Sequence, residues 1–225
     1  MSIADNLTRI RKELSPYNST LIAVSKTHPA EAVKEAFEFG QVDFGENKVQ
    51  ELQDKKVLLP EALHWHLIGH LQTNKVKYIS PYVHLIHSID SLKLLEEVNK
   101  QGVKNNRVIP CLLQVHIAQE ETKFGADEHD IRTWFSTNAL DQFEHIKIKG
   151  FMGMASLTDD QQKIKQEFFQ LKKLFDECAK HYIKPNTDWT DLSMGMSSDY
   201  KLALDEGSNM VRIGSAIFGN RDYTI

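Results

Sequence analysis

The chain has 225 residues, of which 41% are hydrophobic and 26% charged, a composition typical of a globular protein with a sizeable core. A net charge of −4 argues against general nucleic-acid binding, because that requires a basic surface. The first residues lack the basic and apolar regions of a signal peptide, and no apolar run is long enough to cross a membrane. The two cysteines, Cys111 and Cys178, lie far apart in the sequence. These features predict a single cytoplasmic domain over residues 1–225 with no membrane partner. We also expect a monomer.

Apolar periodicity and turn residues predict strands and helices that alternate along the chain. A helix over residues 2–14 comes first. Strands are then predicted at 21–26, 42–45, 63–68, 82–87, 107–115, 146–150, 189–192 and 210–213. Helices are predicted between or after them at 29–39, 47–56, 71–78, 91–101, 127–138, 159–182, 198–206 and 216–218.

Strict alternation of this kind predicts a parallel sheet covered by helices. Eight strand–helix units in this length favour an α/β fold of a single (β/α)8 TIM barrel, with a doubly wound open sheet as the alternative. We expect the leading helix to cap the bottom of the barrel.

Lys26 stands at the mouth of an apolar strand. Burial there would lower the pKa of its amine, and an amine in that state can attack a carbonyl and form a Schiff base. On this stretch alone, a surface lysine that follows a strand is the simpler interpretation.

The seventh and eighth strand ends carry the strongest local signal for an anion. Gly195 would let a backbone approach a ligand closely, and Ser197 and Ser198 stand where a helix is predicted to begin. Gly214 and Ser215 offer a second set of N–H groups and a hydroxyl. Either loop alone is more simply interpreted as a helix cap or a turn. Both loops together favour a phosphate site, because they stand where this fold binds phosphate.

Three histidines raise the possibility of a metal. His64 and His66 lie on one face of a predicted strand, and His70 follows. Because no Asp, Glu or Cys stands at ligand spacing beside them, we interpret them as ordinary histidines and predict no metal site.

Six motifs occur in order along the chain, at residues 23–27 (AVSKT), 44–47 (FGEN), 66–75 (HLIGHLQTNK), 121–125 (ETKFG), 192–197 (LSMGMS) and 211–219 (VRIGSAIFG). Together they closely resemble the pyridoxal phosphate homeostasis proteins, which are single-domain relatives of the alanine racemase barrel. The resemblance extends from about residue 20 to residue 223.

The resemblance implies that Lys26 forms the internal aldimine with pyridoxal 5′-phosphate and that Asn47 lies near the cofactor ring. It implies that Ser197, Gly214 and Ser215 hold the phosphate and that Arg212 faces the pyridine nitrogen. Because arginine stays cationic, it would discourage protonation of that nitrogen and make the ring a weaker electron sink.

The expected function is therefore cofactor binding in the intracellular homeostasis of pyridoxal phosphate, without catalytic turnover and with apo-enzymes as partners. A low-activity pyridoxal-phosphate-dependent amino-acid racemase is the alternative, although the chain ends soon after the eighth strand and offers no evident second base or second domain. A metal-dependent barrel hydrolase is a third hypothesis.

Overall fold

A computed structural model describes residues 2–118 and 124–219 of the chain. Of the motif at 121–125, residues 121–123 lie outside the described residues. Within that part of the chain, no helix is both long and apolar enough to cross a membrane.

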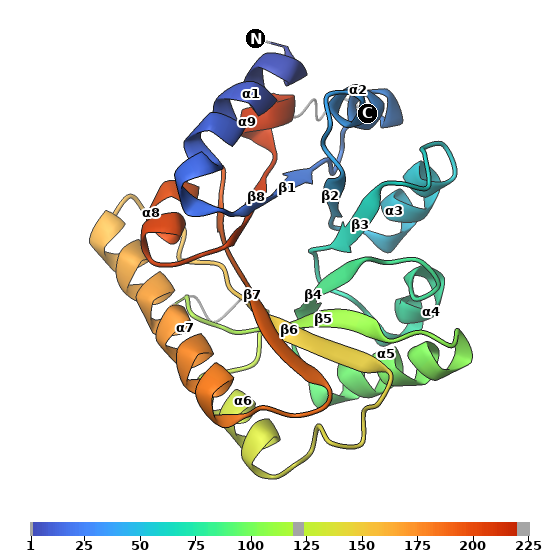
Figure 1. Ribbon diagram of the computed structural model, residues 1–225, viewed down its shortest axis with the longest axis vertical. Coiled ribbons are helices and arrows are strands. Elements are labelled where there is room, and N and C mark those ends of the chain that lie inside the picture. The colour runs from blue at the N-terminus through green and yellow to red at the C-terminus, as the bar shows by residue number, and fades with distance from the viewer. Residues whose placement is uncertain (1, 119–123, 220–225) are drawn as a thin grey trace.

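The described residues form a closed, all-parallel barrel in which each strand pairs with its neighbours in sequence, and the last strand pairs with the first (Figure 1). This confirms the predicted (β/α)8 architecture. The strands are β1 (Thr20–Val24), β2 (Asp43–Glu46), β3 (His64–Leu67), β4 (Leu85–Ile89), β5 (Ile109–Gln114), β6 (Ile146–Met152), β7 (Thr187–Met196) and β8 (Met210–Ile213).

Helices surround the barrel in Figure 1. Most of them connect one strand to the next, whereas α1 precedes the first strand and α9 follows the last. They are α1 (Ile3–Leu14), α2 (Ala30–Glu38), α3 (Val49–Lys56), α4 (Val76–Ile79), α5 (Leu92–Lys104), α6 (Glu128–Ser136), α7 (Gln161–His181), α8 (Tyr200–Asp205) and α9 (Ser215–Phe218). Two short 3-10 helices, η1 (Ser15–Tyr17) and η2 (Thr73–Lys75), adjoin α1 and α4.

Capping residues explain several of the helix starts. Ser2 and Asp5 form a capping box in which each side chain accepts a hydrogen bond from the other residue's backbone N–H. The side chains of Ser91, Asp127 and Asp160 likewise accept from the first turns of α5, α6 and α7. These caps satisfy N–H groups that have no partner within a helix, so the sequence positions of the caps set where the helices begin.

Several predicted boundaries were wrong. α5 continues through Gly102, which was expected to end it. The glycine is there for close packing and not as a helix stop, because a Cβ atom would lie 2.6 Å from the carbonyl oxygen of His145. The helix predicted at 71–78 begins later, as the 3-10 helix η2 followed by the short α4, and the fourth strand begins at Leu85, three residues later than predicted.

β7 is much longer than predicted and includes Ser193 and Gly195, which were expected in a loop. Its ladders to β6 and β8 stabilise residues with low strand propensity. Gly195 has a φ of +90°, and a Cβ atom there would lie 2.7 Å from Cβ of Ala203 and 2.8 Å from Cα of Tyr200. The glycine therefore admits α8, and not a ligand, close to the strand.

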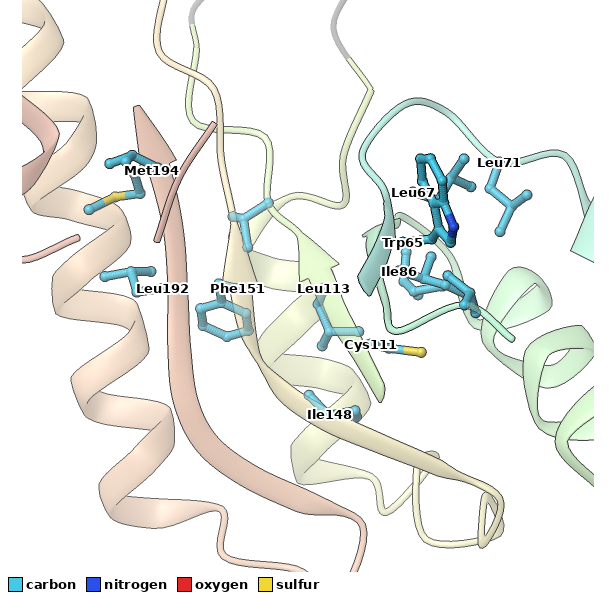
Figure 2. Packing of buried hydrophobic residues seen from close by; sticks show 14 of the residues in the cluster. Trp65, Leu67, Leu71, Ile86, Cys111, Leu113, Ile148, Phe151, Leu192 and Met194 are labelled. Carbon is cyan, nitrogen blue, oxygen red and sulfur yellow. The ribbon is translucent and has the colours of Figure 1, made fainter. Parts of the chain in front are cut away.

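The main hydrophobic core lies between the barrel and the surrounding helices. Figure 2 shows outward-facing strand residues of this layer, among them Leu113, Phe151, Leu192 and Met194. A second, smaller cluster contains Ile22, Leu85, Leu112, Met152 and Met210. It takes one residue from each of five strands, so it fills part of the barrel interior.

The buried residues of the barrel strands also include polar side chains, namely His66, His87, Gln114, Ser193 and Arg212. A barrel interior is normally filled with branched apolar residues. The sequence thus places hydrogen-bonding groups where simple packing would favour apolar ones.

α1 was predicted to cap the bottom of the barrel, but it does not. It lies beside α9 and α2 in the outer layer, where Figure 1 shows α1 and α9 side by side. The side chain of Asn6 donates to the carbonyl of Ile217, and Leu7, Ile10 and Leu14 are buried. The apolar face of α1 therefore completes the helical layer between α8 and α2.

Candidate functional site

A cleft of about 440 Å³ opens at the C-terminal ends of the strands. Five of the six predicted site residues line it, namely Asn47, Ser197, Arg212, Gly214 and Ser215. Its other lining residues are Val24, Ile68, Gly69, His70, Gln114, Phe124, Met154, Met196 and Ser198. The barrel thus brings together residues from the two ends of the sequence, because β8 pairs with β1.

Lys26 lies at the edge of this cleft and is not part of its lining. It is half-buried in the turn that follows β1, two residues after Val24, which does line the cleft. The predicted strand therefore ends earlier, and the lysine stands in a tight turn in which the N–H of His28 donates to the carbonyl of Ser25.

A buried ion pair holds this turn from below. The ammonium group of Lys55, on α3, donates to the carbonyl of Ser25 at 2.7 Å and to Oε1 of Glu46 at 2.7 Å. The hydroxyl of Ser25 donates to the same carboxylate oxygen at 2.6 Å. Burial raises the pKa of Glu46 to about 7, while Lys55 and Ser25 oppose that rise by stabilising the carboxylate.

Glu51 fixes the other side of the turn. Its Oε1 accepts from the ammonium group of Lys55 at 2.8 Å and from the backbone N–H of Thr27 at 2.5 Å. Thr27 has a φ of +67°, which is unusual for a β-branched residue and costs on the order of 1–3 kcal/mol. The hydrogen bonds around Lys55 maintain this strained backbone next to Lys26.

Arg212, on β8, is buried with 4% of its surface exposed. One terminal nitrogen donates to the carbonyl of Ser193 at 2.8 Å and to its hydroxyl at 2.6 Å, and the other donates to the carbonyl of Gly153 at 3.0 Å. Burial lowers the pKa of the guanidinium to about 10, and the nearby charge of Asp199 opposes this. Arg212 therefore stays cationic at neutral pH and is held rigidly at the floor of the cleft.

The seventh and eighth loops are joined directly, because the N–H of Gly214 donates to the hydroxyl of Ser197 at 3.2 Å. α8 begins at Tyr200, later than predicted, so Ser197 and Ser198 stand in the turn before it. α8 and α9 are both short. This corner could therefore offer an anion hydroxyl and N–H groups more than the dipole of a helix.

Gly69 allows the loops after β2 and β3 to touch. A Cβ atom at this position would lie 2.4 Å from the carbonyl oxygen of Asn47, which is far too close for any side chain. The glycine therefore sets the position of Asn47 at the cleft.

His70 and Phe124 form a wall of the cleft. Their rings stack with centroids 4.1 Å apart, and Nδ1 of His70 lies 3.3 Å from a carboxylate oxygen of Asp90. The imidazole is consequently oriented by a carboxylate on one side and an aromatic ring on the other.

A line of buried polar groups runs from Arg212 through the barrel interior. The hydroxyl of Ser193 lies 3.2 Å from Nδ1 of His87, whose Nε2 lies 2.9 Å from Nδ1 of His66, and Nε2 of His66 lies 3.1 Å from Oδ1 of Asp43. Burial lowers the pKa of His66 and takes that of His87 well below its ordinary value, so both rings are neutral at pH 7. The line connects the two ends of the barrel without a buried charge between Arg212 and Asp43.

No metal site was predicted because no carboxylate stands at ligand spacing from His64 and His66 in the sequence. In the fold, Asp43 of the neighbouring strand lies 3.0 Å from Nδ1 of His64 and 3.1 Å from Nε2 of His66. His70 is at the opposite end of the barrel, so the three histidines do not form one group.

Sequence reasoning missed Glu46, Lys55 and Ser193, which support the site from beneath. Lys55 stands on a polar helix and gave no signal of burial, although its spacing of four residues from Glu51 is that of a helical ion pair. Ser193 was assigned to a loop, so its inward orientation could not be inferred.

A comparison with known families matches residues 1–222 to the model of the alanine racemase N-terminal domain. The pyridoxal phosphate homeostasis protein of Aquifex aeolicus is 38% identical over 90% of this chain and 87% of its own length. PipY of Synechococcus elongatus, in a structure with pyridoxal phosphate bound, is 36% identical with a TM-score of 0.87, covering 97% of this chain and all of PipY. Without the cofactor, PipY has a TM-score of 0.90 and 37% identity over the same shares of the two chains. This chain belongs to the family of pyridoxal phosphate homeostasis proteins, built on the N-terminal barrel of alanine racemase.

Proposed function

We propose that this protein binds pyridoxal 5′-phosphate at the cleft and maintains the intracellular supply of that cofactor. The observation that carries the proposal is the buried, cationic Arg212 beneath a cleft that is lined by the joined loops of Ser197 and Gly214 and edged by the Lys26 turn. The names of the relatives and the cofactor in the PipY structure support it. We further propose that the protein acts as a monomer in the cytoplasm and hands the cofactor to apo-enzymes.

The cleft suits a flat ring with a phosphate at one end. Its volume of about 440 Å³ lies within the usual range for small ligands. Ile68, Met154 and Met196 offer apolar contact for the faces of a ring, whereas Ser197 and Ser215 offer hydroxyl groups for an anion. The polar and apolar parts of the lining therefore match the two parts of pyridoxal phosphate.

Each predicted site residue then has a role. Ser197, Gly214 and Ser215 hold the phosphate, Arg212 faces the pyridine nitrogen and Asn47 lies beside the ring. Lys26 would supply the amine that condenses with the aldehyde carbon, whose oxygen would leave as water. When bound, the cofactor provides an aldehyde that combines reversibly with amines and a ring that accepts electrons.

Arg212 favours binding over catalysis. Its guanidinium keeps a positive charge at neutral pH, so a ring nitrogen that faces it is disfavoured from taking up a proton. The unprotonated ring withdraws electrons weakly, and carbanion chemistry at an attached amino acid is correspondingly slow. We therefore propose that the protein holds and releases the cofactor without catalytic turnover.

Reduction with borohydride tests the covalent attachment. The purified protein should be yellow, and borohydride should remove the visible band and leave a pyridoxyl group on Lys26, located by peptide mass spectrometry. Lys26→Ala should abolish the band, and Lys93→Ala, which removes an exposed lysine on α5, should leave it unchanged. A pyridoxyl group on another lysine in the unaltered protein would contradict the assignment.

Transfer of the cofactor tests the role in its supply. Loaded protein is mixed with an apo-enzyme that needs pyridoxal phosphate, and recovery of that enzyme's activity is followed over time. We expect recovery faster than from the same concentration of free cofactor plus albumin. Recovery at or below the rate given by free cofactor would count against a delivery role.

The arrangement of His70 favours a second candidate, a slow amino-acid racemase. Its imidazole lines the cleft and is oriented by Asp90, as a general base would be. Loss of optical rotation from L-alanine, abolished by Lys26→Ala and slowed at least tenfold by His70→Phe, would favour this function. The absence of racemisation at high protein concentration would exclude it for that substrate.

A further inference from the structure

The N-terminal mouth of the barrel, opposite the cleft, carries a cluster of histidines and carboxylates. Asp43 begins β2, His64 begins β3 and His84 directly precedes β4. A cavity of about 550 Å³ opens there, and Asp43, His66, His84 and Asp191 are among its lining residues. Because α1 packs in the outer layer, this mouth is accessible to small solutes.

The potential ligand atoms of this cluster already lie close together. Those of Asp43, His66 and His84 are all within 4.8 Å of one another. A tetrahedral Zn²⁺ ion with bonds of about 2.0–2.1 Å needs its ligand atoms roughly 3.4 Å apart. The 3.1 Å between Oδ1 of Asp43 and Nε2 of His66 is near that value, so small side-chain rotations would suffice to bring the third ligand into place.

A second observation supports a ligand role for His66. Histidines that bind metals usually make a hydrogen bond through their other ring nitrogen, which fixes the tautomer and the ring orientation. His66 is 2% exposed, and its Nδ1 lies 2.9 Å from Nε2 of His87, which in turn lies 3.2 Å from Ser193 through Nδ1. The buried ring is therefore held with Nε2 directed toward Asp43.

Neighbouring groups suit a cation that prefers nitrogen and oxygen ligands. The ring of His64 stacks on that of His84 with centroids 4.1 Å apart, and its Nδ1 lies 3.0 Å from Asp43. Asp191 adds a carboxylate to the same cavity. Two lysines also line it, but Lys149 pairs with Asp188 at 2.7 Å and the ammonium group of Lys147 donates to the carbonyl of Pro185.

We propose that the N-terminal mouth of the barrel is a binding site for a divalent transition-metal ion of the Zn²⁺ type, with Asp43, His66 and His84 as ligands and His64 beside them. The site lies at the opposite end of the barrel from the cofactor cleft, and its assignment does not rest on the proposed function. A set of two imidazoles and one carboxylate is typical of zinc and leaves a fourth position for His64 or water.

The test measures metal binding by tag-free protein that has been treated with a chelator and dialysed. Titration with Zn²⁺ in a calorimeter should give one equivalent per chain, and Co²⁺ should produce the visible absorption of a tetrahedral site. His84→Ala removes an exposed ligand, so the fold should persist, and binding should weaken at least tenfold. His129→Ala removes an exposed histidine on α6 and should leave binding unchanged.

His87→Leu provides an independent check of the supporting hydrogen bond. It should weaken Zn²⁺ binding although His87 does not touch the metal, and circular dichroism verifies that the variant is folded. The proposal is overturned if the unaltered protein takes up less than one equivalent of Zn²⁺, or if His84→Ala and His129→Ala bind it equally well.

Discussion

At the scale of single residues, the site depends on a side chain that does not enter the cleft. Lys55 pairs with both Glu46 and Glu51 and at the same time donates to the backbone of the Lys26 turn. Its ammonium group is buried, and so is the carboxylate of Glu46. A buried ion pair contributes little net stability, but removal of one partner leaves an uncompensated charge.

Lys55→Met should therefore lower the free energy of unfolding by about 3 kcal/mol at pH 8, measured in urea. The loss should be smaller at pH 5, where a proton can neutralise Glu46, since burial already raises its pKa to about 7. Lys34→Met, at an exposed position on α2, is the matched control and should change stability by less than about 0.5 kcal/mol. Equal losses in the two variants would show that the buried pair is unimportant.

At the scale of elements, α1 is fastened to α8 through one carboxylate. Glu13 accepts from the ammonium group of Lys201 at 2.8 Å and from the hydroxyl of Tyr200 at 2.6 Å, and these groups lower its pKa to about 2. A carboxyl group whose pKa is depressed on folding adds stability above its unfolded pKa of about 4.5, and that stability is lost as the pH falls toward 2.

Glu13→Gln should consequently be less stable than the unaltered protein by about 1 kcal/mol at pH 7, a figure reduced for the partial exposure of the side chain. The difference should shrink as the pH is lowered from 5 to 3, because the unfolded chain then takes up a proton at Glu13 whereas the folded protein, in which the pKa of Glu13 is about 2, does not. Urea unfolding at several pH values measures it, with Glu38→Gln on α2 as an exposed control. A difference that stayed constant with pH would contradict the assigned role of Glu13.

At the scale of the whole molecule, closure of the barrel couples the cofactor cleft to global stability. Every strand except the fourth, or the loop that follows it, contributes residues to the cleft, so a ligand bound there contacts both ends of the chain. A ligand that binds only the folded state stabilises it by about 2.7 kcal/mol at a concentration of 100 times Kd.

Pyridoxal phosphate at that concentration should raise Tm by about 5–10 °C for a chain of this size. Pyridoxine phosphate has the same ring and phosphate but no aldehyde, so it should raise Tm less. In Lys26→Ala the two ligands should have equal effects, because only the bond to Lys26 distinguishes them. If pyridoxal phosphate stabilised the variant as much as the unaltered protein, Lys26 would not be the point of attachment.

The sequence by itself determined the barrel and most of the cleft. The alternation of apolar strands with capped helices is a local property, and in a parallel barrel it places every strand end on the same face. Asn47, Arg212 and Gly214 could therefore be assigned to one site before any contact between them was known. Lys26 could be assigned to the same face of the barrel, but its position outside the lining of the cleft could not be predicted.

The tertiary structure alone decided the contacts between strands. Several pairs of contacting residues lie far apart in the sequence, in most cases by 20 to 30 residues or more. Examples are Lys55 beneath Ser25, Asp43 beside His66, and Ser193 between Arg212 and His87. Their contacts depend on register and on the closure of the barrel. A one-residue change of register would turn each side chain to the other face of its strand. Sequence periodicity shows which residues share a face of a strand but not which residues of neighbouring strands lie opposite one another, and for that reason the supporting groups and the cluster at the opposite mouth were found only in the fold.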